Sequence, residues 1–543
     1  MTQFLETLWR DFRYAARTLR QHPAFTSLVV LTLALGIGAN TAIFSALNAV
    51  VIEPLPYHDP DRLVRLWESN RGQGQGRVEN PVSVPNFQDW QKQQTVFEQL
   101  AAAELTTFNL TGNGEPQRIP ALRITANLPA TLGVRPLVGR SFFHDEETSG
   151  RDRVALMSYG LWQREFGGNV SVVNRTIQLN GESYTVVGIM PREFQFLGRE
   201  LWVPLVMDPA KEPWRADRAN RNLSVFGRLK PGVSVDRAVS EMNVVAARLE
   251  QQHPQANQGW ELHLKTFYDW IVPEQVRWSM IALSLFVGLL LLIACANVAN
   301  LLLVRATSRQ HEMAIRGALG ARPARLVRQL LVESFLLAGV GGLFGLLLTY
   351  WGASLIASGN FQNVARLSET RIDGRVLVFS LVITAITGLV FGLIPAWWAA
   401  NVNLSEKLKE SARNEGARTT HRLRSVLVVS EVTLAVALLV AAGLLVQTVR
   451  RLQAVPLGFA PENLITMQVS LPGAKYPQAE QRVNFFSRLV ERLRTVPGVV
   501  DAAAAESAPA SAGDWTTEIT IEGDAGGINE ARTSAAAHVA TPG

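Results

Sequence analysis

The sequence predicts an α-helical membrane protein with about five transmembrane helices, an extracytoplasmic α/β domain and the start of a second such domain. Only 18% of the 543 residues are charged, whereas soluble proteins average about 25%, and the mean hydropathy is +0.11. Five apolar stretches are long enough to cross a bilayer, which takes about 20 residues. Positive charge gathers beside alternate stretches, as expected of a multi-pass membrane protein.

The apolar stretches divide the chain into membrane and polar segments. The first predicted span covers residues 25–51, three more lie within 277–400, and the fifth covers 426–449. The polar segments between and around them are residues 1–24, 52–276, 401–425 and 450–543. Cys295 is the single cysteine of the chain, which excludes a disulfide-stapled scaffold.

Loop charges predict the orientation of the spans. Residues 1–22, 305–328 and 401–424 carry net charges of +2, +5 and +3, whereas the whole chain carries +6. Short basic loops remain in the cytoplasm, so the N-terminus is expected inside and the two large polar segments outside. Membrane topology also explains the pI of 9.6, and nucleic acid is therefore not an expected partner.

The N-terminal segment, residues 1–24, predicts a cytoplasmic amphipathic helix at the membrane surface. Its apolar stripe consists of Phe4, Leu8, Phe12 and Leu19, together with Leu5 and Trp9. Arginines occupy the other side, and Pro23 ends the pattern. The simpler alternative is a flank of the first span with no further role.

The outer segment, residues 52–276, predicts a folded α/β domain. Two alternating runs flank Asn180-Gly181, a pair typical of a β-hairpin turn. Ser234 is suited to cap a helix. The apolar face of that helix would comprise Ala238, Met242, Val245 and Leu249.

A partial repeat follows the fifth span. PLPYHDPDRLVRL begins at Pro54, after the first span, and PLGFAPENLITM begins at Pro456, after the fifth. Tyr57 aligns with Phe459 in this comparison. The second copy is incomplete at Gly543, so we expect a truncated duplication, with a natural short variant as the alternative.

No catalytic, cofactor or metal site is predicted. No lysine follows a glycine, so the phosphate-binding loop of an ATPase is not encoded. His311-Glu312 begins a zinc-protease pattern, but position 315 is Ile. We therefore expect no enzymatic activity and no cofactor on this chain.

Small and polar residues within the spans predict helix packing. Gly341 and Gly345, and likewise Gly388 and Gly392, have the four-residue spacing that lets helices approach closely. Asn40, Asn48 and Glu333 are also in or near predicted spans, where polar groups more often join helices than line a transport path. No row of ionisable residues crosses the membrane, which argues against an ion-coupled transporter.

The basic segment 305–328 has a pattern of its own. Arg309–Leu319 predicts a short amphipathic helix, Gly320-Ala321 a turn and Pro323 the start of the next helix. A short, rigid, basic segment with an apolar face, held between two membrane helices, is suited to docking a cytosolic partner. An ordinary cytoplasmic loop is the alternative, because such loops are basic by default.

These residues resemble the signature of FtsX-like permeases, the membrane subunits of MacB- and LolC/E-type ABC systems. The resemblance rests on Arg309, Glu312, Met313, Arg316, Ala318, Leu319, Gly320 and Ala321. Residues 154–196 are similar to the MacB-like periplasmic core domain. The whole chain is similar to the duplicated permeases of acidobacteria.

The resemblance implies a multi-pass protein of the bacterial inner membrane. Segment 305–328 would couple to a dimer of cytosolic ABC ATPases, which would bind the ATP. Further expected partners are a second permease half (the chain's own C-terminal half or a second chain), a periplasmic adaptor and membrane lipid. The implied function is a permease subunit that passes ATP-driven motion to the outer domain for export. The alternatives are a mechanical transmitter that regulates an outer partner such as a cell-wall hydrolase, and a scaffold without an ATPase.

Overall fold

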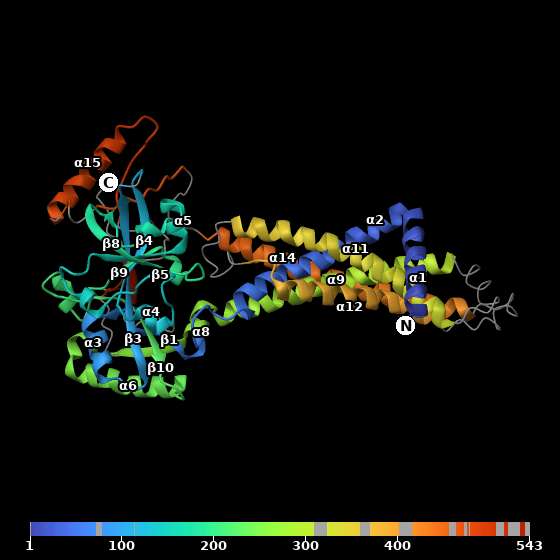
Figure 1. Ribbon diagram of the computed structural model, residues 1–543, viewed down its shortest axis with the longest axis horizontal. Helices are drawn as coiled ribbons and strands as arrows, with labels where there is room; N and C mark the ends of the chain where they lie inside the picture. Colours follow the sequence, from blue (N-terminus) through green and yellow to red (C-terminus); the bar gives the residue numbers. More distant parts are fainter. Residues whose placement is uncertain are drawn as a thin grey trace. The chain divides into compact units, whose positions relative to one another are not determined.

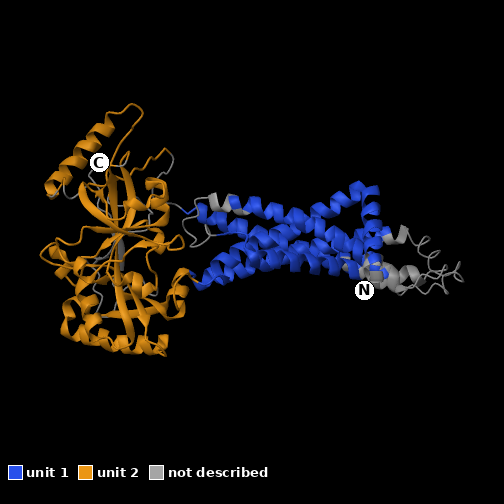
Figure 2. Cartoon of the chain, in the orientation of Figure 1, with its two compact units in different colours: residues 1–54, 272–455 blue, residues 55–271, 456–543 orange. Residues whose placement is uncertain are grey.

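The computed structural model separates into two compact units (Figure 2). Unit 1 comprises residues 1–54 and 272–455, and unit 2 comprises residues 55–271 and 456–543. The structure describes residues 2–71, 79–112, 114–308, 323–358, 370–400, 415–455, 463–471, 475–476, 478–505, 515–519 and 533–537.

Unit 1 is a bundle of long apolar helices (Figure 1). Its helices are α1 (Thr2–Gln21), α2 (Pro23–Leu47), α9 (Glu274–Ser308), α11 (Pro323–Ser358), α12 (Gly374–Ala400) and α14 (Glu415–Gln453). Five helices of the described residues, all but α1, are long and apolar enough to cross a membrane, which confirms the predicted number. A π-helical turn, η1 (Asn48–Ile52), extends α2.

Two helix starts show how local sequence sets the boundaries. Pro23 begins α2 directly after α1, because proline fits the first helical turn, where no amide donor is needed. The second span begins a few residues before the predicted position. The amides of Val276 and Arg277 both donate to the carbonyl of Pro273, so the first turn of α9 forms before the apolar run starts.

Helices α2, α9, α11 and α12 share one apolar core. Its fully buried side chains include Leu33, Ile37, Val298, Leu337 and Phe391. Since these side chains come from all four helices, burying them requires all four to pack together.

Unit 2 contains an 11-stranded mixed sheet. The main path runs β11-β1-β10-β3-β4-β9-β6-β8-β5, and β2 and β7 pair off this path. The strands are β1 (Leu63–Asn70), β2 (Val82–Ser83), β3 (Phe97–Thr111), β4 (Gln117–Ile124), β5 (Val138–Gly139), β6 (Val154–Met157), β7 (Thr176–Leu179), β8 (Glu182–Ile189), β9 (Leu201–Pro204), β10 (Arg221–Leu229) and β11 (Trp260–Thr266). Pairs β4–β9 and β6–β8 are parallel and the other pairs antiparallel.

Short helices cover this sheet. They are α3 (Val84–Gln93), α4 (Leu128–Leu132), α5 (Tyr159–Phe166), α6 (Val235–Gln252), α7 (Pro254–Asn257) and α8 (Phe267–Ile271). Helices α3 and α6 share a core with β1, β10 and β11, while α5 packs with β6, β8 and β9. A middle cluster contains Phe196, Phe226 and Phe267, so the sheet is buried along its length.

Two local predictions for unit 2 are confirmed. Strands β7 and β8 pair with Leu179 opposite Glu182, and the turn residues Asn180 and Gly181 both have positive φ, as a two-residue hairpin requires. The Ser234 side chain accepts a hydrogen bond from the amide of Arg237 at the start of α6. The buried face of α6 is the predicted one, Ala238, Met242, Val245 and Leu249.

That residues 450–543 begin a second outer domain remains a prediction. Residues 456–543 group with 55–271, and the Gln468 amide accepts a hydrogen bond from Arg118 of β4. The described elements are α15 (Ala479–Arg494) and an antiparallel pair, β12 (Trp515–Ile519) and β13 (Thr533–Ala537).

A buried ion pair joins two strands of the outer sheet. The Glu68 carboxylate of β1 accepts hydrogen bonds from Arg221 of β10 and from Asn86 of α3, both at 2.8 Å. The Arg221 guanidinium lies over the Trp260 ring, 3.6 Å from its centroid. Burial raises the pKa of Glu68, and Arg221 acts in the opposite direction. Removing either partner would leave the other as a buried charge without a counter-charge.

We expect Glu68→Gln to lower the free energy of unfolding by about 3–5 kcal/mol, because it leaves the Arg221 charge buried without compensation. The matched control is Glu98→Gln, which breaks the exposed Arg62–Glu98 pair and should cost about 1 kcal/mol or less. Urea titration of the purified full chain, followed by tryptophan fluorescence, measures both values. Equal losses would show that the buried Glu68–Arg221 pair contributes no more to the free energy of unfolding than the exposed Arg62–Glu98 pair.

Candidate functional site

One end of the bundle is held by a buried ion pair between α9 and α11. Arg305 of α9 donates to Glu333 of α11 at 3.1 Å, and both side chains are largely buried. The Arg305 guanidinium also lies 4.8 Å from the centroid of the Phe25 ring of α2 and reaches the Thr18 carbonyl of α1. A single side chain of α9 therefore contacts three other helices, α1, α2 and α11.

A second ion pair ties α1 to α11 at the same end. Arg328 donates from Nε to the Asp11 carboxylate at 2.8 Å, and Asp11 is buried. Arg305 and Arg328 are the first and last residues of the basic segment 305–328. The predicted coupling residues of that segment (Arg309, Glu312, Met313, Arg316, Ala318, Leu319, Gly320 and Ala321) lie outside the described residues. The described structure thus shows the two ion pairs, Arg305–Glu333 and Asp11–Arg328, that hold the ends of the segment.

In the middle of the bundle, α2 and α11 approach through glycines. A Cβ added to Gly345 would lie 3.0 Å from the amide nitrogen of Gly38, and one added to Gly341 would lie 2.7 Å from the Cβ of Leu33. The Thr349 hydroxyl donates to the Gly38 carbonyl at 3.0 Å. Since the neighbours include backbone and Cβ atoms, a side chain at these glycines would force the helices apart.

The other predicted glycine pair lies between α12 and α11. A Cβ at Gly388 would lie 3.1 Å from Ala338 and Phe335 side-chain atoms, and one at Gly392 would lie 2.9 Å from the Cβ of Ser334. The two glycine pairs therefore bring α2 and α12 against α11, which is the central helix of these contacts.

Asparagine joins α2 to α9. The buried Asn40 amide donates to the carbonyls of Gly36 and Val287, both at 2.9 Å. The first bond lies within α2 and the second crosses to α9. This is the interhelical role that polar residues of membrane spans commonly have.

The opposite end of the bundle is held by a third polar cluster, where α2 leads into unit 2. Asn48, in the π-helical turn, donates to Asp373 at 3.0 Å, and Ser45 donates to the Arg371 carbonyl at 3.0 Å. Arg371 donates to Glu53 at 2.9 Å. Asp373 also accepts the amide of Val376 at the start of α12. This cluster fixes the last turns of α2 to the segment that precedes α12.

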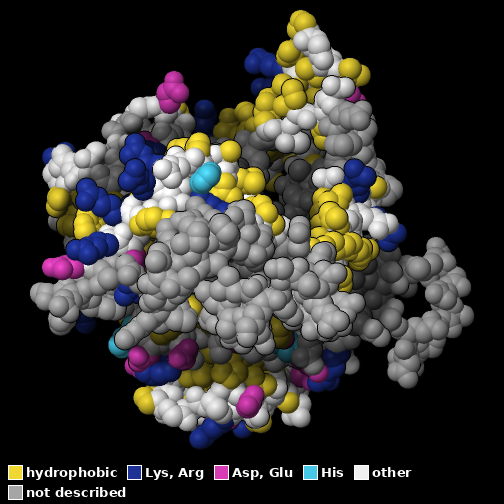
Figure 3. Space-filling view, turned by 90° about the vertical axis from the view of Figure 1, so that its right-hand side faces the viewer, with side chains coloured by type: hydrophobic (Ala, Val, Ile, Leu, Met, Phe, Trp, Pro, Cys, Tyr) yellow, Lys and Arg dark blue, Asp and Glu magenta, His cyan; other side chains and the backbone are white. Residues whose placement is uncertain are grey.

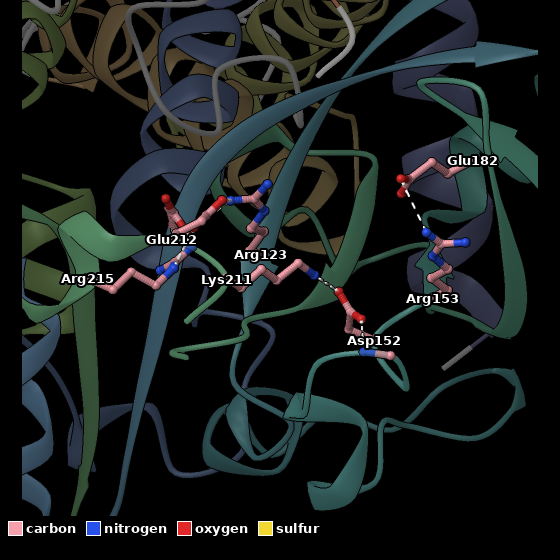
Figure 4. Close-up of polar contacts among 9 residues, drawn as sticks. Arg123, Asp152, Arg153, Glu182, Lys211, Glu212 and Arg215 are labelled. Carbon is pink, nitrogen blue, oxygen red and sulfur yellow. Dashed lines mark hydrogen bonds and ion pairs between the residues drawn. The ribbon is translucent and has the colours of Figure 1, made fainter. Parts of the chain in front are cut away.

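Partly buried ion pairs of unit 2 form a separate set (Figure 4). Arg123 pairs with Glu104 at 3.7 Å and with Glu212 at 3.3 Å, and Asp152 pairs with Lys211. Burial alone would raise the pKa of Asp152, but the Lys211 ammonium and backbone hydrogen bonds hold it below its ordinary value. This pair therefore stabilises the fold above the ordinary carboxyl pKa and loses that effect as the pH falls through the lowered value.

A half-open cleft of about 430 Å³ lies beside β7 in unit 2. Glu165, Phe166, Arg175 and Gln178 are among its lining residues. No group of three or more His, Cys, Asp or Glu side chains within the described ranges could hold a metal ion. The charged groups that connect separate elements of the bundle are instead those of the clusters at its two ends.

Two protein-family models match the chain. The MacB-like periplasmic core domain matches residues 26–245, and the FtsX-like permease C-terminal domain matches residues 284–404. The chain belongs to the FtsX/MacB-like family of ABC transporter permeases. The first match covers the first span and most of the outer sheet, and the second covers α11, α12 and most of α9.

Curated relatives are similar to the chain over about half of its length. The chain is 25% identical over 274 residues to the uncharacterized ABC transporter permease YknZ of Bacillus subtilis, which covers 50% of this chain and 65% of that protein. It is 26% identical over 277 residues to the macrolide export ATP-binding/permease protein MacB of Chlorobium luteolum, covering 50% and 40% respectively. The alignments thus span less than two thirds of each relative.

A solved structure, the extracellular domain of YknZ from Gram-positive bacteria, is similar over 37% of this chain and 99% of its own length. Its sequence identity is 15% and its TM-score 0.29.

The residues that sequence reasoning missed are the charged partners of the bundle ends. Asn40, Asn48 and Glu333 attract attention as polar residues in apolar helices. Asp11 and Arg328 look like ordinary residues of polar flanks, as do Arg305 and Asp373. A buried carboxylate in a predicted span requires a partner, which was the one available signal for Arg305.

We expect Gly345→Leu to destabilise the bundle by about 1–3 kcal/mol or more, because the added side chain meets backbone atoms of α2. The matched control is Gly339→Leu in the same helix, since a Cβ there has no described atom within 4 Å. Thermal unfolding of both variants in detergent, followed by size-exclusion chromatography, measures the difference. Equal behaviour of the two variants would contradict a tight α2–α11 contact.

Proposed function

We propose that this chain is the permease subunit of a MacB/FtsX-type ABC system in a bacterial inner membrane. In this proposal a dimer of cytosolic ABC ATPases, on separate chains, binds the ATP and docks on segment 305–328. Movement passes through the bundle to the outer domain and drives export. The observation that carries the proposal is the pair of domain matches on one chain, one for the outer domain and one for the permease helices.

The bundle contacts support a mechanical path. Arg305–Glu333 and Asp11–Arg328 tie the flanks of the coupling segment to α1 and α11. At Gly345, helix α11 packs closely against α2. The Asn48–Asp373 hydrogen bond fixes the end of α2, from which the chain continues into the outer domain, to the start of α12. Displacement of the inner end of α11 would therefore also displace the end of α2 from which the chain continues into unit 2.

Helix α14 supports a second permease half as partner. Only 6% of the residues in its most apolar stretch are buried, compared with 22–39% in the other four spans. A span that packs so little against its own bundle is suited to pack with further helices. A periplasmic adaptor would contact the outer domain, and lipid would surround the bundle. The export functions named for MacB relatives favour transport over purely mechanical signalling.

We expect charge reversal at Arg309 and Arg316 to abolish capture of a cytosolic ATPase from the native host, because both residues lie in the proposed docking segment. The control reverses Arg450 and Arg451 at the far end of α14, which makes the same charge change away from that segment. Membrane fractionation should give equal insertion for both variants. Unchanged ATPase capture after reversal at 309 and 316 would contradict the docking assignment.

The orientation can be tested with engineered cysteines in a Cys295→Ala background, which removes the single native thiol. We expect Ser183→Cys, an exposed position of the outer sheet, to react with a membrane-impermeant maleimide in spheroplasts. Gln21→Cys, an exposed position at the end of α1, should react only after permeabilisation. Labelling of Gln21→Cys in sealed spheroplasts would place the N-terminus outside.

A further inference from the structure

Helix α1 presents three different faces along its length. The face that packs on the bundle contains Asp11, Ala15, Thr18 and Leu19, all buried. The next sector carries Trp9 and Phe12, which are 62% and 46% exposed and stack with ring centroids 5.8 Å apart. The third sector carries four exposed arginines, Arg10, Arg13, Arg17 and Arg20. At about 100° per residue, these arginines form one stripe.

The position of α1 places these faces at the membrane boundary. Only His22 separates α1 from α2, whose candidate span begins at Pro23. Figure 1 shows α1 running across the bundle rather than along it, and Asp11–Arg328 holds it there. In Figure 3, basic and apolar side chains are exposed beside one another on the face in view. Exposed aromatic rings at this depth would meet acyl chains, and the arginines would meet headgroups.

We propose that the arginine stripe of α1 binds anionic phospholipid and that this binding regulates the inner end of α11. Four guanidiniums in one row complement several negative headgroups, and a cytoplasmic leaflet rich in anionic lipid attracts such a row. Binding would hold α1 against the membrane surface. The Asp11–Arg328 pair then connects α1 to the first turns of α11, beside segment 309–322. The effect on ATPase docking rests on the proposed function, whereas the binding of lipid by α1 does not.

The binding step is tested by adding phosphatidylglycerol or phosphatidylcholine to the purified full chain in detergent and measuring the midpoint of thermal unfolding. We expect phosphatidylglycerol to raise the midpoint by several degrees and phosphatidylcholine to have little effect. Replacing the four α1 arginines by Gln should abolish the difference. The control replaces four exposed arginines of unit 2, Arg135, Arg175, Arg192 and Arg248, and should retain it. An equal loss in both variants, or an equal response to both lipids, overturns the proposal.

The connection to α11 is tested by hydrogen–deuterium exchange in the same samples. We expect phosphatidylglycerol to slow exchange in residues 323–340 of the native chain. Asp11→Asn should keep the thermal shift but lose this protection, because it removes the link to Arg328. Protection that persists in Asp11→Asn overturns the connection.

ATPase capture distinguishes this inference from the proposed function. If the native chain captures no ATPase but keeps its response to phosphatidylglycerol, the proposed function fails and lipid binding by α1 stands. If the arginine-to-Gln variant of α1 loses ATPase capture and the native chain has no response to phosphatidylglycerol, the stripe binds protein and the lipid proposal is overturned.

Discussion

The close contact between α2 and α11 is the constraint on which the bundle depends. At Gly38 and Gly345 the backbones of α2 and α11 lie so close together that a side chain does not fit between them. The Thr349 hydroxyl adds a hydrogen bond across this contact. Apolar side chains alone give little preference for one helix partner inside a membrane, because lipid is equally apolar. Small residues and buried polar groups therefore decide which helices meet and at what level.

The charged groups that pair in the bundle lie near its two ends, while Asn40 and Thr349 join helices between those ends. Arg305, Glu333, Asp11 and Arg328 hold the end that carries the basic segment, and Asn48 with Asp373 holds the end from which the chain continues into unit 2. Breaking a buried pair costs more than forming it gains, so each cluster favours movement of its helices as a group.

The outer domain is stabilised by different means. Its large sheet has a core made from short helices and aromatic side chains, with Glu68 and Arg221 as a buried ion pair between strands. No substrate site is defined by these contacts. The domain is suited to move as one body because its apolar clusters follow one another along a continuous sheet.

Sequence alone determined the features that depend on neighbouring residues. Span number follows from apolar length, the Asn180-Gly181 hairpin from backbone conformations that few residues adopt, and the start of α6 from the hydroxyl of Ser234. The family followed from motifs for the same reason, since they are continuous in the chain. Only the tertiary structure decided which polar groups meet, because Asp11 and Arg328 are 317 residues apart and Asn48 and Asp373 are 325 apart. No local pattern records such a pairing; it arises when burial leaves a charge or an amide with one partner within reach.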